Sequence, residues 1–190
     1  MEKIKAYTGR IINEIDRLNA LLASVKYIAR PAIRYMVDFN LSEVAHTVVD
    51  LYREELRQKG ITIRLDSKQH DITFRGNPDS FHQILSNLIK NAQEALANRK
   101  NGEIQVGLRL HNKLVDIEVI DNGKGIPDNM LESLGKKPFV TTKPYGMGLG
   151  LFVVDTLTRG CSGTLAFAKG PSGYGTMVKI SLPLLRLNEV

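Results

Sequence analysis

The sequence has little of what builds disulfide scaffolds, zinc centres or membrane spans. Only one of its 190 residues, Cys161, is a cysteine, which excludes an internal disulfide, and no Cys/His cluster has zinc-ligand spacing. The sequence also lacks a signal-peptide pattern and any run of about eighteen apolar residues. We therefore expect a cytoplasmic setting, with membrane attachment only through segments upstream of Met1.

Aromatic residues and clustered positive charge are scarce as well. The net charge is +6, but the basic residues are scattered among acids, aromatic residues make up 6% of the chain, and tryptophan is absent. This composition argues against a nucleic-acid partner and favours a solvated basic surface that tolerates a phosphate ligand. The apolar fraction of 43% is sufficient for one well-buried domain with an appendage.

Residues 4 to 29 have the pattern of a helix that pairs with another helix. The seam positions alternate spacings of four and three, and they are Ile4, Thr8, Ile11, Ile15, Leu18, Leu22, Val25 and Ala29. Pro31 ends this helix, because proline lacks the backbone N–H and its ring disfavours continuation. We expect residues 1–30 to form a separate helix and residues 31–190 to form the main domain.

Helices and strands follow one another irregularly in the rest of the chain. Asn40 is a good N-cap for a helix that ends at Gly60, with Glu43 at the capping-box position. Two further helices are predicted at 80–99 and 148–160, and period-two alternation predicts strands at 61–65, 103–110, 114–120, 164–168 and 175–182. This order predicts an α+β fold, a two-layer α/β sandwich with helices on one face of a mixed sheet, and not a doubly wound parallel sheet.

The helix predicted at 80–99 carries an unusual polar stripe. Gln83, Asn87, Asn91 and Glu94 follow one another on one side of it. Asparagine is a mediocre helix former, so two of them four residues apart invite an explanation. Either both side chains hydrogen-bond neighbouring loops, or the pair binds a ligand.

A second pattern lies where the strand predicted at 114–120 ends. The sequence "VIDNGKGIP" places Asp121, Gly123 and Gly125 directly after that strand. DNG is a common hairpin turn, but the residues that follow, "PDNMLESLGKKPFVTTKPYG", are polar, bounded by proline and offer no strand that pairs back. We therefore expect Asp121 to open onto a long loop of the kind that forms functional lids.

The third pattern is "GMGLGL" at 146–151, immediately before the helical pattern "LFVVDTL". Glycines at the start of a helix expose unpaired N–H groups at the positive end of the helix dipole, which is a physical site for phosphate. The sequence contains no Walker loop, and the glycine spacing differs from the Rossmann fingerprint.

Taken in order, the three patterns resemble the N, G1 and G2 boxes of the Bergerat ATP-binding fold. The segments "NLIKNAQEA", "DNGKGIP", "PFVTTK" and "GMGLGL" together are similar to a sensor histidine kinase, over essentially the whole chain. The resemblance implies ATP and Mg²⁺ as ligands and a response regulator receiver domain as partner. It also implies that residues 1–30 are the second helix of the phosphoacceptor hairpin, through which the full-length protein forms a homodimer.

The resemblance further implies roles for individual residues. Asp121 accepts a hydrogen bond from the adenine exocyclic amine, Asn91 binds the Mg²⁺ that bridges the phosphates, and Phe139 holds the lid. The other implied nucleotide contacts are Asn87, Lys90, Gly123, Gly125, Ile126, Thr142, Lys143, Gly146, Met147, Gly148, Leu149, Gly150 and Thr176.

Asn87 bears on which reaction the site supports. Members of the superfamily that hydrolyse ATP to drive motion carry a glutamate at this position as the base for water, and an asparagine cannot take a proton. Phosphoryl transfer to a histidine needs mainly positioning and charge neutralisation, so Asn87 favours a kinase. Glu94 on the same stripe is a second possible base, which leaves a conformational ATPase as an alternative, and a nucleotide-binding pseudokinase scaffold is another.

No histidine of the chain matches the phosphoacceptor. Family members phosphorylate a histidine that is followed by an acidic residue on the first helix of the hairpin. His46 and His82 fall inside other predicted helices, His111 falls at a hairpin tip, and His70 lies in a loop. We expect the acceptor upstream of Met1, and we assign no catalytic residue within the chain.

Overall fold

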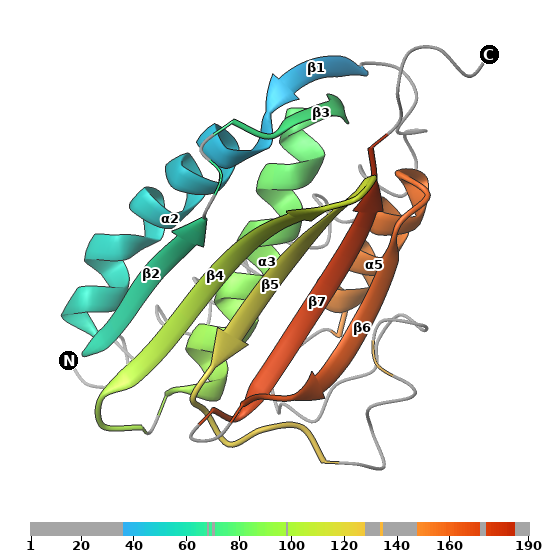
Figure 1. Cartoon of the computed structure of the whole chain (residues 1–190). Helices are drawn as coiled ribbons and strands as arrows, with labels where there is room; N and C mark the ends of the chain where they lie inside the picture. The colour runs from blue at the N-terminus through green and yellow to red at the C-terminus, as the bar shows by residue number, and fades with distance from the viewer. Residues whose placement is uncertain are drawn as a thin grey trace, which may run out of the picture.

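The computed structural model describes residues 36–67, 69, 71–97, 99–127, 134, 148–171 and 174–184. Within these residues the chain forms a five-stranded sheet, a separate two-stranded sheet and three long helices (Figure 1). The heptad helix predicted at residues 4–29 lies outside the described residues, so it stays a prediction.

The large sheet is mixed, as expected. Its strands lie in the order β2 (Ile61–Ser67), β4 (Gly102–His111), β5 (Leu114–Asp121), β7 (Thr176–Pro183) and β6 (Thr164–Lys169). β2 runs parallel to β4, and the other neighbours are antiparallel. All five strands predicted from the alternation are confirmed, with ends shifted by one or two residues.

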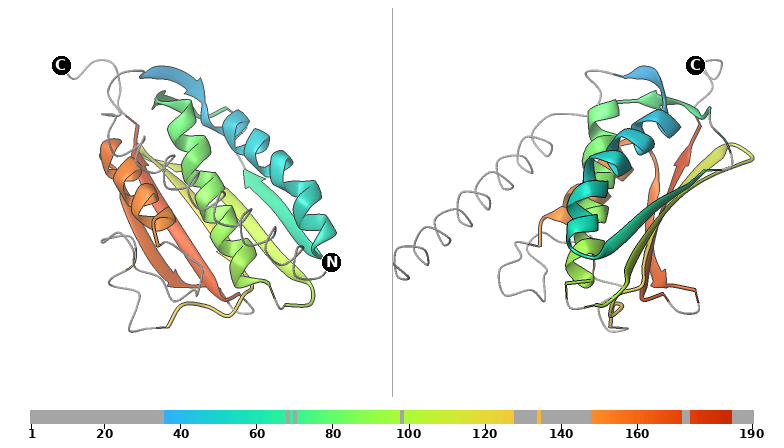
Figure 2. Two further views of the ribbon diagram at one scale, coloured as in Figure 1. Left: turned by 180° about the vertical axis from the view of Figure 1, so that it is seen from behind. Right: turned by 90° about the vertical axis from the view of Figure 1, so that its left-hand side faces the viewer.

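Three helices cover one face of this sheet, namely α2 (Leu41–Gln58), α3 (Pro78–Ala95) and α5 (Gly150–Gly160) (Figure 2). α3 lies in the middle and packs against both α2 and α5. Successive residues of a strand point to opposite faces, so Val115, Ile117 and Val119 of β5 enter the core beneath the helices. The predicted two-layer α+β sandwich is therefore confirmed.

Asparagine caps set the starts of the two longer helices. The side chain of Asn40 accepts from the N–H groups of Ser42 and Glu43, which confirms the predicted cap. Asn77 caps α3 in the same way through the N–H of Asp79, so α3 begins at Pro78, two residues before the predicted start. Proline is well suited to this first turn because its missing N–H has no partner there in any case.

A small antiparallel sheet at one end of the molecule was not predicted from the sequence. It pairs β1 (Val37–Asn40) with β3 (Thr73–Gly76), and four residues are too few for a period-two pattern to stand out. Its stability comes from three aromatic rings, because Phe39, Phe74 and Phe81 pack edge to face with centroids 5.0 to 6.1 Å apart. The described part of the chain has no helix that is long and apolar enough to span a membrane.

Candidate functional site

Asp121 is the last residue of β5 and lies on the face that the helices cover. It is 5% exposed, and its carboxylate accepts a 2.8 Å hydrogen bond from the N–H of Gly123 and another from the hydroxyl of Thr176, its cross-strand neighbour on β7. Burial raises the pKa of Asp121 above its ordinary value, and the two hydrogen bonds and the charge of Arg99 only partly oppose this effect. The carboxylate is thus held by neutral donors.

Three glycines let the backbone pack closely around this carboxylate. The N–H of Gly175 donates to the carbonyl oxygen of Asp121 at 2.7 Å. A Cβ on Gly175 would lie 2.2 Å from the carbonyl oxygen of Gly123, and a Cβ on Gly123 would lie 2.6 Å from Oδ1 of Asp121. Gly125 has a φ of +76°, in the left-handed region that favours glycine. Side chains at these positions would displace the carboxylate.

A second group of residues lies where α3 faces the start of α5. A Cβ on Gly150 would lie 3.2 Å from Oδ1 of Asn87 and 3.8 Å from Nδ2 of Asn91, so both asparagines face the first residue of α5. Within the described part of the chain, the first turn of α5 has no side-chain cap and no acidic residue. Its N–H groups therefore remain available to an anion at the positive end of the helix dipole.

Asn87 and Asn91 differ in the hydrogen bonds of their side-chain amides. The amide of Asn87 donates to the backbone oxygen of Gln83 at 2.9 Å. The amide nitrogen of Asn91 is buried and has no hydrogen-bond partner among the described residues. A carboxamide that is not held by its nitrogen can turn its oxygen toward a cation without losing a hydrogen bond of that nitrogen. Asn91 therefore fits the role of a Mg²⁺ ligand, because Mg²⁺ takes oxygen ligands and keeps several waters.

α3 connects the two groups. A Cβ on Gly123 would lie 2.9 Å from the carbonyl oxygen of Ala95, which is one helical turn after Asn91. Asp121 and the two asparagines thus lie beside successive turns of α3.

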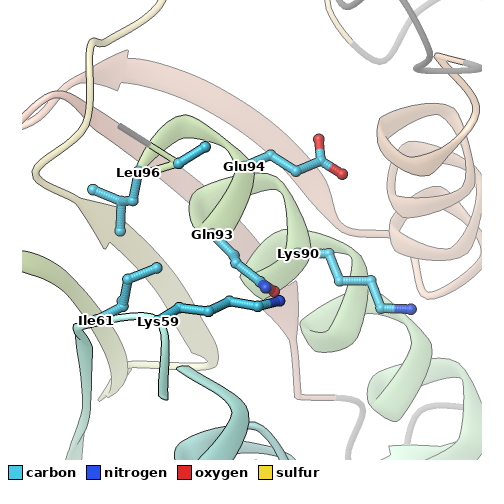
Figure 3. A pocket seen from close by; sticks show the side chains of 7 residues that line it. Lys59, Ile61, Lys90, Gln93, Glu94 and Leu96 are labelled. Atoms are coloured by element: carbon cyan, nitrogen blue, oxygen red, sulfur yellow. The ribbon is translucent and has the colours of Figure 1, made fainter. Parts of the chain in front are cut away.

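Lys90 is exposed on another side of α3. It lines a pocket of about 450 Å³ together with Lys59, Ile61, Gln93, Glu94, Leu96 and Ala97 (Figure 3). Lys59 and Gln93 both bind the carboxylate of Glu55 on α2. None of Asn87, Asn91 and Asp121 lines this pocket, so the structure places Lys90 beside the site and not within it.

The remaining predicted contacts divide into two sets. Ile126, Gly148 and Leu149 are described, and Leu149 is buried directly before α5, while Gly148 has a φ of +63°. The residues outside the described part of the chain are Phe139, Thr142, Lys143, Gly146 and Met147. Their roles stay predictions.

Two residues around Asp121 were missed at the level of sequence. Asn122 joins the end of β5 to the start of β4. Its side chain accepts from the N–H of Glu103 at 2.7 Å and donates to the backbone oxygen of Asn101 at 3.0 Å. Gly175 provides the close backbone approach described above. Its position directly before β7 was the signal in the sequence that could have identified it.

Comparison with known proteins shows the family of the chain. A family model described as histidine kinase-, DNA gyrase B- and HSP90-like ATPase matches residues 76–186. The chain belongs to this family. The matched range begins at the end of β3 and includes all the residues of the candidate site.

Individual relatives of this ATPase-family chain are kinases. Sporulation kinase A of Bacillus subtilis is 30% identical over 184 residues, which is 96% of this chain and 30% of that protein. The catalytic domain of histidine kinase ThkA matches with a TM-score of 0.72 at 26% identity, over 79% of this chain and 96% of that one. Histidine kinase ThkA in complex with the response regulator TrrA matches with a TM-score of 0.80 at 23% identity, over 98% of this chain and 53% of that one.

The chain spans between 30% and 47% of the length of the first three curated relatives that it matches. Three of the four histidines lie where the sequence predicted them: His46 is on α2, His82 is on α3, and His111 is at the β4–β5 turn. His70 lies outside the described residues.

Proposed function

We propose that the chain is the ATP-binding catalytic part of a sensor histidine kinase and that it transfers the γ-phosphoryl group of ATP to a histidine on another segment. One observation carries this proposal. The buried carboxylate of Asp121 lies near one end of α3, and Asn91 on the same helix faces the start of α5, where no side chain among the described residues caps the helix. The family match and the kinase relatives support it.

Base recognition is assigned to the end of β5. Asp121 accepts a hydrogen bond from the exocyclic amine of adenine, and Thr176 and Gly123 hold the carboxylate in place. Since the carboxylate has no ion-pair partner among the described residues, its unshared acceptor positions are available to a ligand. Burial around it excludes water, which strengthens this hydrogen bond relative to one on the surface.

Phosphate binding is assigned to the start of α5. Gly148 and Gly150 bring backbone N–H groups to the phosphates, and Asn87 faces the same place. When bound through Asn91, Mg²⁺ supplies neutralisation of phosphate charge. Thr142, Lys143, Gly146 and Met147 are assigned to the same end by the sequence patterns. Lys90 is not assigned there, because it lines the neighbouring pocket.

The nature of residue 87 favours transfer over hydrolysis. The Asn87 amide donates to Gln83, and an asparagine is not a base for water. Binding and orientation of the triphosphate are then the functions of the chain, and an imidazole from the phosphoacceptor hairpin is the nucleophile. We assign residues 1–30 to that hairpin, residues 31–190 to the catalytic domain, and the final phosphoryl acceptor to a response regulator aspartate.

A labelling experiment tests this proposal. After incubation with γ-labelled ATP and Mg²⁺, the chain alone stays unlabelled, and label appears on a separately supplied hairpin that carries the acceptor histidine. Label on the chain alone would contradict the assignment of the acceptor. Steady phosphate release by the chain alone would favour the conformational ATPase, and nucleotide binding with neither transfer nor release would favour the pseudokinase scaffold.

A further inference from the structure

Tyr174 lies on the opposite side of the sheet from the candidate site. Its hydroxyl donates to Oε2 of Glu103 at 2.9 Å and accepts a hydrogen bond from the side-chain amide of Gln105. Glu103 and Gln105 belong to β4, whereas Tyr174 directly precedes Gly175 and β7, and β5 lies between β4 and β7. The tyrosine side chain therefore reaches over the end of β5, across two strand spacings of about 4.8 Å each.

Glu103 holds both segments that form the base end of the site. Its backbone N–H donates to Oδ1 of Asn122 at 2.7 Å, and its carbonyl oxygen accepts from the N–H of Asn122 at 3.1 Å. Its side chain accepts from Tyr174. The residue after Asp121 and the residue before Gly175 are thus attached to the same point on β4.

The segment that Tyr174 holds has no room to shift independently of Asp121. The N–H of Gly175 donates to the backbone oxygen of Asp121, and a Cβ on Gly175 would collide with the backbone of Gly123 and Gly125. The next residue, Thr176, donates to the Asp121 carboxylate. A displacement of residue 174 would therefore move two of the groups that orient this carboxylate.

The chemistry at Tyr174 suits a fixed donor. The hydrogen bond to Glu103 raises the pKa of the Tyr174 phenol above its ordinary value, with smaller contributions in the same direction from burial and from the charge of Glu103. The phenol is therefore protonated throughout the neutral range. The backbone of Tyr174 is held as well, since its N–H donates to the oxygen of Pro171 at 2.8 Å.

We propose that Tyr174 is a positioning residue for nucleotide binding, which holds Gly175 and Thr176 against Asp121 from the far face of the sheet through its hydrogen bonds to Glu103 and Gln105. This inference rests on the proposed function, because it takes Asp121 to be the base-binding carboxylate. It assigns Tyr174 no contact with the nucleotide.

Calorimetric titration with Mg-ATP and Mg-ADP tests the inference in Tyr174→Phe, which keeps the ring and removes the hydroxyl. Loss of one net hydrogen bond corresponds to a factor of about three to ten, so we expect both affinities to fall by that factor. Because Tyr174 acts at the base end, ATP and ADP lose affinity equally. A change at the phosphate end would weaken ATP more than ADP.

Two further variants separate positioning from general stability. Glu103→Gln keeps an acceptor oxygen for the phenol, so we expect it to lose less ATP affinity than Tyr174→Phe. Asp66→Asn removes the ion pair with Arg109, which joins β2 to β4 away from residues 174–176. We expect it to leave ATP affinity unchanged, whether or not it lowers thermal stability.

The outcomes distinguish the inference from the proposed function. Equal ATP affinity of Tyr174→Phe and the unaltered chain would overturn the inference alone, as would an equal loss of affinity in Asp66→Asn. If the unaltered chain binds no nucleotide, the proposed function and the inference both fail.

Discussion

β5 carries two buried aspartates whose surroundings are opposite. Asp116 is 3% exposed and Asp121 is 5% exposed. Asp116 lies 2.5 Å from Nζ of Lys179 and 2.9 Å from Nε2 of His111, and it accepts from the hydroxyl of Ser181. Within the described part of the chain, Asp121 accepts only from neutral donors, Gly123 and Thr176.

The pKa of each carboxyl reflects this difference. For Asp116, burial raises the pKa, but hydrogen bonds from Lys179 and Ser181 and the charges of Lys179 and His111 together lower it below its ordinary value. For Asp121, burial dominates and the pKa is raised. Removing a buried carboxylate that has its own cations destabilises the fold, because the cations lose their partner, whereas a carboxylate without cations keeps its acceptor positions for a ligand.

The largest expected effect is on nucleotide binding at Asp121. Asp121→Asn keeps the shape but replaces the charged acceptor, and we expect ATP affinity to fall by about 1.5–3 kcal/mol, roughly 10- to 150-fold. Stability is expected to be unchanged or higher, since the variant no longer buries a charge without a counter-ion. Calorimetry and denaturant unfolding measure the two quantities. A drop in stability with unchanged ATP affinity would show that Asp121 stabilises the fold and does not bind the nucleotide.

The next effect concerns Asn91 and depends on the metal. Asn91→Ala is expected to weaken ATP binding about tenfold or more with Mg²⁺ present, because even indirect partners of a bound metal alter its affinity by about 10–100-fold. In EDTA the variant and the unaltered chain are expected to bind alike. Gln93→Ala is the matched control on α3, because Gln93 is bonded to Glu55 of α2. An equal loss with and without Mg²⁺ would remove Asn91 from the metal site.

Asp116→Asn is expected to change stability instead of binding. The variant leaves Lys179 without its main partner, but that side chain is 34% exposed and can turn to water, so we expect a loss of about 1–3 kcal/mol in the free energy of unfolding. ATP affinity is expected to stay within about twofold. Asp50→Asn breaks the exposed pair with Arg53 and serves as a control with little effect.

The smallest effect is on the pH dependence of stability. Asp116 has a lowered pKa in the folded state, so its contribution is present above the ordinary value near 4 and is lost as pH falls through the folded pKa. Asp121 has a raised pKa, so its contribution favours the folded state below the ordinary value and is lost as pH rises through the folded pKa.

These signs predict opposite changes in two variants. From pH 7 toward pH 3, Asp116→Asn is expected to lose less stability than the unaltered chain, and Asp121→Asn is expected to lose more. Denaturant unfolding at each pH measures both, and slopes that change in the same direction in the two variants would contradict the pKa assignments.

Most of the fold could be predicted because its signals are local. The strand alternation, the Asn40 cap and the two-faced pattern of α3 each depend on a few adjacent residues. The small β1–β3 sheet could not be predicted, since its stability comes from Phe39, Phe74 and Phe81, which meet only in the folded chain.

The residues of the site also differ in whether local sequence could predict them. Asp121 was found because it ends a strand that no hairpin follows, and Asn87 and Asn91 because they share a helix face. Tyr174 and the Asp116 cluster were not found, because each depends on the register of three strands. An aspartate within an alternating strand gives no sign of whether a cation lies opposite it.

The most direct test of the account is the preference for adenine at Asp121. Calorimetry measures the affinities of ATP and of inosine triphosphate, which has a carbonyl in place of the exocyclic amine, for the unaltered chain and for Asp121→Asn. We predict that the unaltered chain prefers ATP by at least about tenfold, as expected for a hydrogen bond to a charged acceptor, and that the variant loses this preference. An unchanged preference in Asp121→Asn would show that another residue reads the base.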